Sequence, residues 1–213
     1  MNASARRLCW FGVVGPSLFA LAVIVCGALR SEYSHVTQFI SELGETGGEN
    51  AALMQYAGFI LPGAFIALFA IPFWRAFRSA GVLAVLVALL VAIHGVAKIA
   101  AGSFSCDLGC TPKIPSMDHV RHQQAAHVGL FALTAAAFLC VFLFKRFAAW
   151  KRLRAYTLAT GIFAIIFAVA MVVSIESRSA TGLFQRLFVG GLYLWLVIVA
   201  LRLLRLWDAR EPT

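Results

Sequence analysis

Six long blocks of apolar residues alternate with short polar segments along the chain. Each block contains about 20 residues, the length that a helix needs to cross a hydrocarbon core roughly 30 Å thick. Because no water bonds free backbone groups inside a bilayer, each block is predicted to be helical. The predicted spans are residues 8–29, 53–73, 82–101, 124–144, 155–175 and 185–207.

The composition agrees with this pattern, since 62% of the 213 residues are hydrophobic and only 13% are charged. A soluble domain of this size has too little polar surface to cover so much apolar material. The connections between the blocks leave no room for a second domain. The sequence therefore predicts one all-α domain over residues 1–213, a polytopic membrane protein whose six transmembrane helices pair as three hairpins.

The basic residues predict the orientation, because Lys and Arg are enriched in cytoplasmic loops. Twelve of the 18 lie beside the two termini and the second and fourth connections: Arg6, Arg7, Arg75, Arg78, Lys145, Arg146, Lys151, Arg152, Arg154, Arg202, Arg205 and Arg210. Both termini are thus predicted to be cytoplasmic, in the plasma or inner membrane of the cell. Because the basic residues flank apolar spans, the net charge of +9 indicates topology signals and contacts with anionic lipid, and no nucleic-acid partner.

The first outer loop carries an apolar pattern that is typical of one helical face. Val36, Phe39, Ile40 and Leu43 are spaced i, i+3, i+4 and i+7. The pattern predicts a short amphipathic helix over residues 34–43 that lies in the outer interface of the membrane.

The second outer loop contains two cysteines four positions apart, Cys106 and Cys110. Outside a bacterial cytoplasm such a pair usually oxidises, so a disulfide is predicted, with free thiols or metal ligands as the alternatives. The bridge would fix the direction of Asp107. Later in the loop, Ser116 is predicted to be the N-cap of a helix that continues into the fourth span.

One ionisable pair lies inside the third span. His94 is a candidate site residue because ionisable groups in a bilayer are costly and normally face the interior of the bundle. Lys98, one turn away, is interpreted as reaching toward the interface.

Three further histidines follow one another at the outer end of the fourth span: His119, His122 and His127. Taken alone, His122 is interpreted as a solvated surface residue. Four carboxylates share this depth: Glu42, Asp107, Asp118 and Glu176. Imidazoles and carboxylates in a partly dry pocket are the ingredients of a zinc site that holds an activated water. They are equally the ingredients of a structural polar network.

Several short motifs resemble a known family. They are Ser-Glu-Leu-Gly at 41–44, Gly-Phe at 58–59, Phe-Ser-Cys-Asp-Leu-Gly-Cys at 104–110, the later His127, and Gly-Leu-Phe-Gln-Arg at 182–186. Together they resemble domain-of-unknown-function family 998, which consists of six-helix membrane proteins. The resemblance implies the fold and the membrane location but no activity. It singles out Ser41, Glu42, Cys106, Asp107, Cys110, His127, Gln185 and Arg186.

The leading hypothesis is an outward-facing site in which Glu42, Asp107 and His127 converge, together with His94. Such a site suits a hydrolase or group transferase acting on a lipid or lipid-linked substrate, with His127 or a carboxylate as the base. Ser41 is a candidate nucleophile. A zinc ion held by His127, Asp107 and Glu42 is optional.

Substrate binding is assigned to Arg186 and Gln185, because a guanidinium holds anionic oxygens in a fork. The alternative is a membrane scaffold for a protein partner, in which Arg186 pairs with Glu42 or Asp107 in a structural network. A small transporter is less favoured, since the inner halves of the spans are almost purely apolar.

Overall fold

The computed structural model describes residues 3–209 and is built from helices joined by short loops. Within these described residues, six helical segments are long and apolar enough to cross a membrane, which confirms the prediction of six spans. They are α1 (Ala3–Leu29), α2 (Ala51–Leu53) continued by η2 (Met54–Ile60) and α3 (Leu61–Phe77), α4 (Val82–Ser103), α5 (Met117–Lys145), α6 (Arg154–Val173) and α7 (Thr181–Asp208). Short 3-10 helices lie in the connections: η1 (Ile40–Gly44), η3 (Arg78–Ala80), η4 (Leu108–Cys110) and η5 (Ala148–Leu153).

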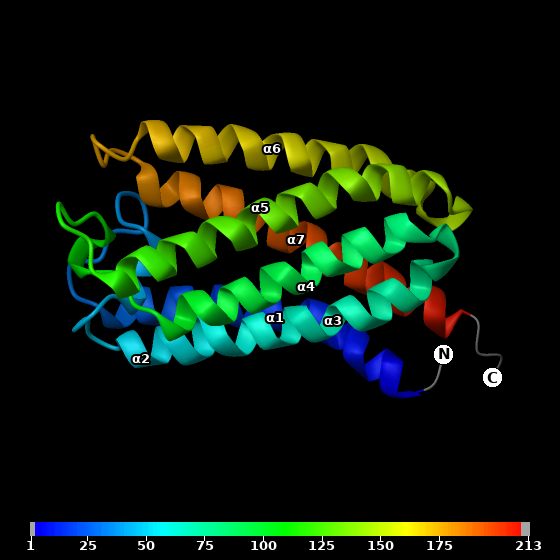
Figure 1. The fold of residues 1–213 in the computed structure, drawn as a ribbon, viewed down its shortest axis with the longest axis horizontal. Helices are drawn as coiled ribbons and strands as arrows, with labels where there is room; N and C mark the ends of the chain where they lie inside the picture. Colours follow the sequence, from blue (N-terminus) through cyan, green and yellow to red (C-terminus); the bar gives the residue numbers. More distant parts are fainter. Residues whose placement is uncertain (1–2, 210–213) are drawn as a thin grey trace.

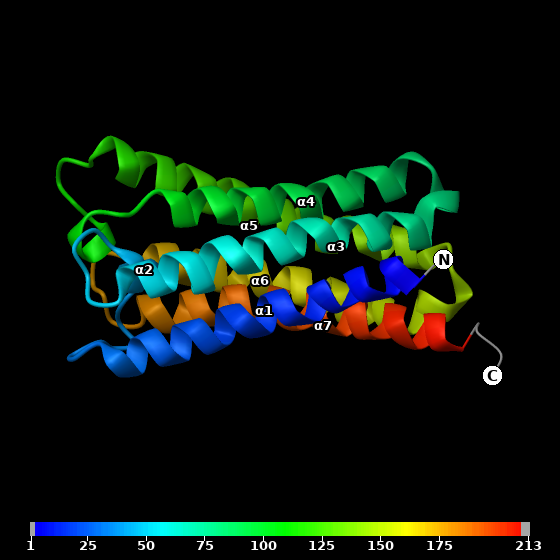
Figure 2. The ribbon, with the colours of Figure 1, turned by 90° about the horizontal axis from the view of Figure 1, so that it is seen from below.

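The helices form a closed ring in which each packs against the next: α1, α3, α4, α5, α6 and α7, with α7 returning to α1 (Figures 1 and 2). Large side chains such as Phe69, Phe73 and Trp195 fill the centre and are fully buried. The outer surface carries exposed apolar side chains, among them Phe131 and Val173. An apolar core inside an apolar surface fits a protein whose solvent is lipid.

The second span is a composite helix. Residues Met54–Ile60 form a π-helix, and Pro62 opens α3 directly after it. Proline has no N–H and its ring clashes with the carbonyl four positions back, which is that of Gly58. The widened π turn therefore accommodates Pro62 without ending the span.

Both termini lie at one end of the bundle, and the long polar loops lie at the other (Figure 1). These loops are residues 30–50, 104–116 and 174–180. Which end faces the cytoplasm stays a prediction from the distribution of Lys and Arg.

The prediction of an amphipathic α-helix over residues 34–43 is wrong. The segment instead forms a turn at residues 35–37 followed by η1, and Val36 is exposed whereas Ile40 and Leu43 are buried. The Phe39 N–H donates to Glu42 Oε1 at 3.0 Å, and the Ile40 N–H donates to Gln185 Oε1 at 2.6 Å. Because these donors bond side chains rather than carbonyls one turn back, no α-helix forms there.

Two local predictions in the second loop are confirmed. Cys106 and Cys110 form a disulfide. Ser116 is the N-cap of α5, and its Oγ accepts the His119 N–H at 3.1 Å. The helix thus begins several residues before the predicted span, which brings His119 and His122 into its first turns.

Candidate functional site

Two buried carboxylates join the three polar loops at the end of the bundle opposite the termini. Glu42 Oε1 pairs with Arg178 Nη1 at 2.7 Å, and Glu45 Oε1 pairs with Arg30 Nη2 at 2.5 Å. The side chains of Glu42 and Glu45 are only 2% and 1% exposed. Charge-assisted bonds of this kind are strong where water is excluded. They hold η1 against the start of the first loop and the loop before α7.

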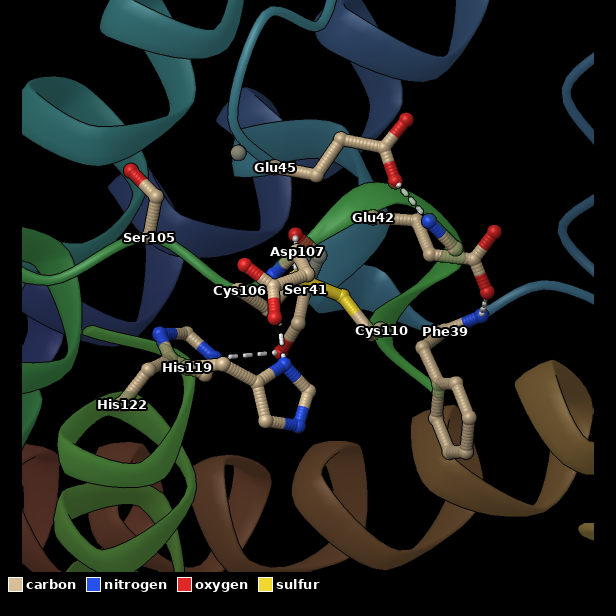
Figure 3. The surroundings of a disulfide bond; sticks show 12 residues. Phe39, Ser41, Glu42, Glu45, Ser105, Cys106, Asp107, Cys110, His119 and His122 are labelled. Atoms are coloured by element: carbon tan, nitrogen blue, oxygen red, sulfur yellow. Dashed lines mark hydrogen bonds between the residues drawn. A yellow bond between two sulfur atoms is a disulfide. The ribbon is translucent and has the colours of Figure 1, made fainter. Parts of the chain in front are cut away.

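Gly109, between the two disulfide cysteines, ties the second loop to the same ion pairs. Its N–H donates to Glu45 Oε2 at 2.6 Å, and its carbonyl accepts from Arg178 Nη2 at 2.6 Å. Gly109 has a φ of +71°, a conformation that glycine adopts at little cost. The disulfide loop is therefore clamped onto η1 (Figure 3).

Ser41 and His122 meet beneath this clamp (Figure 3). The Nε2 atom of His122 lies 3.0 Å from Ser41 Oγ, while its Nδ1 lies 2.7 Å from the Ala101 carbonyl and 2.9 Å from the Phe104 carbonyl. Since a carbonyl only accepts, Nδ1 carries the proton and Nε2 is free to accept the hydroxyl proton of Ser41. A serine hydroxyl, an imidazole acceptor and the carbonyls that orient the imidazole are thus linked by consecutive hydrogen bonds.

Ser41 also lines a cavity inside the ring of helices. The cavity walls are largely apolar and include Phe19, Phe59 and Val189. Its polar lining consists of Ser41, His94, Lys98, Gln185 and Tyr193. An apolar cavity with a few convergent polar groups is the usual form of a ligand site.

Gln185 lies on the cavity wall, and its role in substrate binding stays a prediction. Its Oε1 is occupied by the Ile40 N–H. The Nε2 amide is therefore the donor that Gln185 can offer to a ligand.

Arg186 is held by neutral acceptors. It donates to the Gln38 carbonyl at 3.0 Å, the Gly182 carbonyl at 2.9 Å and the Tyr33 hydroxyl at 2.5 Å. The predicted pairing of Arg186 with Glu42 or Asp107 is wrong, because Arg178 occupies Glu42. Arg186 Nε is inaccessible to solvent and, among residues 3–209, has no hydrogen-bond partner.

Asp107 positions the start of α5. Its Oδ2 accepts the Ser116 N–H at 2.8 Å, and its own N–H donates to His119 Nδ1 at 3.2 Å. The bonds from the backbone and side chain of Ser116 hold the pKa of the Asp107 carboxyl below its ordinary value. Asp107 therefore joins the disulfide loop to the N-terminus of α5.

The predicted trio of Glu42, Asp107 and His127 does not assemble. His127 is exposed on α5, and across the described part of the chain no three His, Cys, Asp or Glu side chains are grouped to hold a metal ion. The physical reason is helical phase: at 100° per residue, His127 points about 140° away from His122.

His94 faces the interior of the bundle, as predicted. Its Nδ1 lies 2.8 Å from the Gly129 carbonyl and its Nε2 lies 3.1 Å from the Tyr193 hydroxyl. Both ring nitrogens of His94 thus already have hydrogen-bond partners. Lys98 does not reach toward the interface, and that interpretation is wrong: it is 8% exposed and points into the cavity.

His122 is the residue that sequence reasoning misjudged, since it is buried rather than solvated. The signal lay in the spacing of α5. His122, Gly129, Leu133 and Ala136 recur at intervals of seven, four and three, which places them on one buried face. His127 falls between these positions, beside the exposed Val128.

Six apolar helices packed in a ring, with a polar cluster at one end, define a multi-pass integral membrane protein. The chain belongs to the family described as protein of unknown function (DUF998), whose family model matches residues 13–202. The predicted resemblance to this family is thereby confirmed. A comparison with curated proteins found no match, and neither did a comparison with solved structures.

Proposed function

We propose that the protein is a membrane-embedded serine hydrolase or acyl transferase that acts on a lipid or lipid-linked substrate. The observation that carries this proposal is the 3.0 Å contact between Ser41 Oγ and His122 Nε2, with His122 Nδ1 oriented by two main-chain carbonyls. A nucleophile, a base and a group that orients the base are the parts that this chemistry requires.

In the proposed reaction, Ser41 Oγ attacks the carbonyl carbon of an ester while its proton passes to His122 Nε2. The Ala101 and Phe104 carbonyls hold the Nδ1 proton and stabilise the imidazolium that forms. The Nε2 amide of Gln185 is the candidate donor to the developing oxyanion. His122 then returns the proton to the leaving alcohol, and water or a second alcohol cleaves the acyl-Ser41 bond.

The surroundings of Ser41 suit a lipid. Ser41 is only partly exposed, and the cavity that it lines is walled by apolar side chains. With both termini in the cytoplasm, as the basic residues indicate, this end of the bundle faces the outer leaflet of the cell membrane. A substrate would then enter from the outer leaflet.

The carboxylates have supporting roles in this proposal. Glu42 is fixed by Arg178 and by the Phe39 N–H, so it holds η1, the element that presents Ser41. Asp107 fixes the start of α5, the element that presents His122. Both are positioning residues, and no step of the reaction requires a metal ion.

The paired charges of Glu42 and Glu45 also suit a second candidate, a scaffold whose outer loops bind a protein partner. In that function the Ser41–His122 contact would be structural. The two functions differ in whether the Ser41 hydroxyl is nucleophilic.

A fluorophosphonate probe tests the proposal, because it phosphonylates activated serines with loss of fluoride and leaves ordinary ones unmodified. The purified protein, reconstituted in lipid, should be labelled at Ser41, as located by peptide mass spectrometry. Ser41→Ala should abolish the labelling. Ser103→Ala is the matched control, since Ser103 is an exposed serine near the same end whose hydroxyl bonds only the Ile99 carbonyl. Labelling that is absent in the wild type, or unchanged in Ser41→Ala, would exclude the enzyme and favour the scaffold.

A further inference from the structure

Lys98 is buried inside a group of aromatic rings on the wall of the cavity. Its Nζ lies 3.6 Å from the ring centroid of Phe19, 4.8 Å from that of Phe59 and 5.4 Å from that of Tyr193. These rings come from α1, η2 and α7, while Lys98 comes from α4. Four helical segments of the bundle therefore converge on the Lys98 ammonium group.

The charge of Lys98 has no counter-charge among the residues that the structure describes. Among residues 3–209, no carboxylate lies within salt-bridge distance of Nζ and no acceptor forms a hydrogen bond with it. The ring faces attract a cation, but they offer no lone pairs to its three N–H donors. A buried charge without a partner is costly, and inside a membrane it generally marks a functional site.

The neighbouring polar groups do not supply a counter-charge or a hydrogen-bond acceptor to the Lys98 ammonium group. His94, one turn earlier on α4, already bonds the Gly129 carbonyl and the Tyr193 hydroxyl. Tyr193 in turn points its hydroxyl at His94. Gln185 is neutral. Lys98 is thus the single charged side chain among the residues that line the cavity.

We infer that Lys98 is the anion-binding group of this cavity, and that the ligand is a single-chain amphiphile with an anionic oxygen head, a carboxylate or a phosphate monoester. The ammonium would hold the anionic oxygens, and the apolar lining would hold part of the chain. A cationic head group such as a quaternary ammonium does not fit, because Lys98 already occupies the aromatic cage. The inference rests on the proposed function in one respect: it names the class of substrate or product that Ser41 would process.

Binding is measured on Ser41→Ala protein in lipid nanodiscs, so that no turnover occurs. The three probes share one chain: oleate, oleoyl lysophosphatidate and neutral mono-oleoylglycerol. We expect one or both anionic probes to bind more tightly than the neutral one. Lys98→Met should weaken anion binding by about tenfold or more while leaving the neutral probe unchanged. The relative affinities of the two anions identify the head group.

Lys98→Arg retains the charge and should retain most of the anion preference, whereas His127→Ala, on the exposed face of α5, should bind as the parent does. Equal binding of the charged and neutral probes would overturn the inference, and so would anion binding that Lys98→Met leaves unchanged. Should Lys98→Met fail to fold, the preference of the parent protein and Lys98→Gln decide instead. The result is independent of the labelling experiment. If Ser41 is not labelled but Lys98 binds the anionic probes, the proposed enzymatic function is excluded and the anion-binding site at Lys98 is supported.

Discussion

The Ser41 hydroxyl lies 3.0 Å from Nε2 of His122, although 81 positions separate the two residues in the chain. Each of the two residues is held in place by its own set of interactions. Ser41 sits in η1, which the Glu42–Arg178 ion pair fixes, and His122 is fixed by the Ala101 and Phe104 carbonyls. Two independently anchored groups are therefore presented to each other in a fixed geometry, as a nucleophile and its base require.

The contact predicts that the histidines of α5 are not equivalent. His122→Gln should slow fluorophosphonate labelling of Ser41 by about a hundredfold or more, the usual contribution of a general base. His127→Gln should label at the wild-type rate, since His127 is exposed and lies on another face of α5. Labelling rates from gel fluorescence over time would measure both. Equal rates in the two variants would remove His122 from the proposed reaction.

The buried ion pair of Glu42 and Arg178 predicts a loss of stability on neutralisation. Glu42→Gln leaves Arg178 without a counter-charge and weakens the bond to the Phe39 N–H. Because Arg178 is 30% exposed, water screens part of the loss, and we expect a decrease of about 2 kcal/mol in the free energy of unfolding. Thermal unfolding in detergent measures it.

The matched control is Arg121→Gln, which breaks the exposed pair with Asp118. The side chains of that pair are 52% and 61% exposed, and their nitrogen and oxygen are 3.4 Å apart. Its loss should change the stability by about 0.5 kcal/mol or less. If both variants shift the melting temperature equally, burial gives Glu42 no special role.

Hydropathy and local chemistry account for what the sequence predicted well. The six spans follow from the apolar blocks because a bilayer imposes one length and one secondary structure on each. The cap at Ser116 and the Cys106–Cys110 disulfide depend on residues three or four positions apart, so neighbouring sequence is sufficient for both.

The partner of each charge could not be predicted in this way. Glu42 bonds Arg178 across 136 positions rather than Arg186, the arginine of the family motif. The choice depends on how α7 and its preceding loop dock on η1, which hydropathy does not encode. Likewise, Lys98 resembles an interfacial lysine in sequence, and only the convergence of Phe19, Phe59 and Tyr193 turns it inward.

Asp107 predicts a specific dependence of stability on acid. The bonds from Ser116 lower the pKa of the Asp107 carboxyl below its ordinary value of 3.8. A carboxyl whose pKa is lower in the folded state stabilises the fold above its unfolded pKa, and that contribution is lost as the pH falls through the folded pKa. The melting temperature of the wild type should therefore lose this contribution only below a pH of about 3.8.

Asp107→Asn separates this group from the other carboxylates. Asparagine keeps an acceptor for the Ser116 N–H but does not titrate. Melting temperatures recorded from neutral pH to below 3.8 should consequently fall less steeply in the variant. Parallel curves for the two proteins would show that the ionised Asp107 does not stabilise the start of α5.

Two glycines of α7 predict opposite responses to alanine. A Cβ on Gly182 would collide with the Gln38 carbonyl and lie 2.9 Å from Arg186 Nη1, whereas a Cβ on Gly190 would meet no atom within 4 Å. Gly182→Ala should push the start of α7 from the first loop and cost about 1–3 kcal/mol of stability.

Gly182→Ala should also slow labelling of Ser41, because Gln185, three residues later, holds the Ile40 N–H of η1. Gly190→Ala should be neutral or stabilising by up to about 1 kcal/mol. Thermal unfolding and labelling of both variants check this pair, and a Gly182→Ala protein as stable and reactive as Gly190→Ala would contradict the close approach of α7 to the first loop.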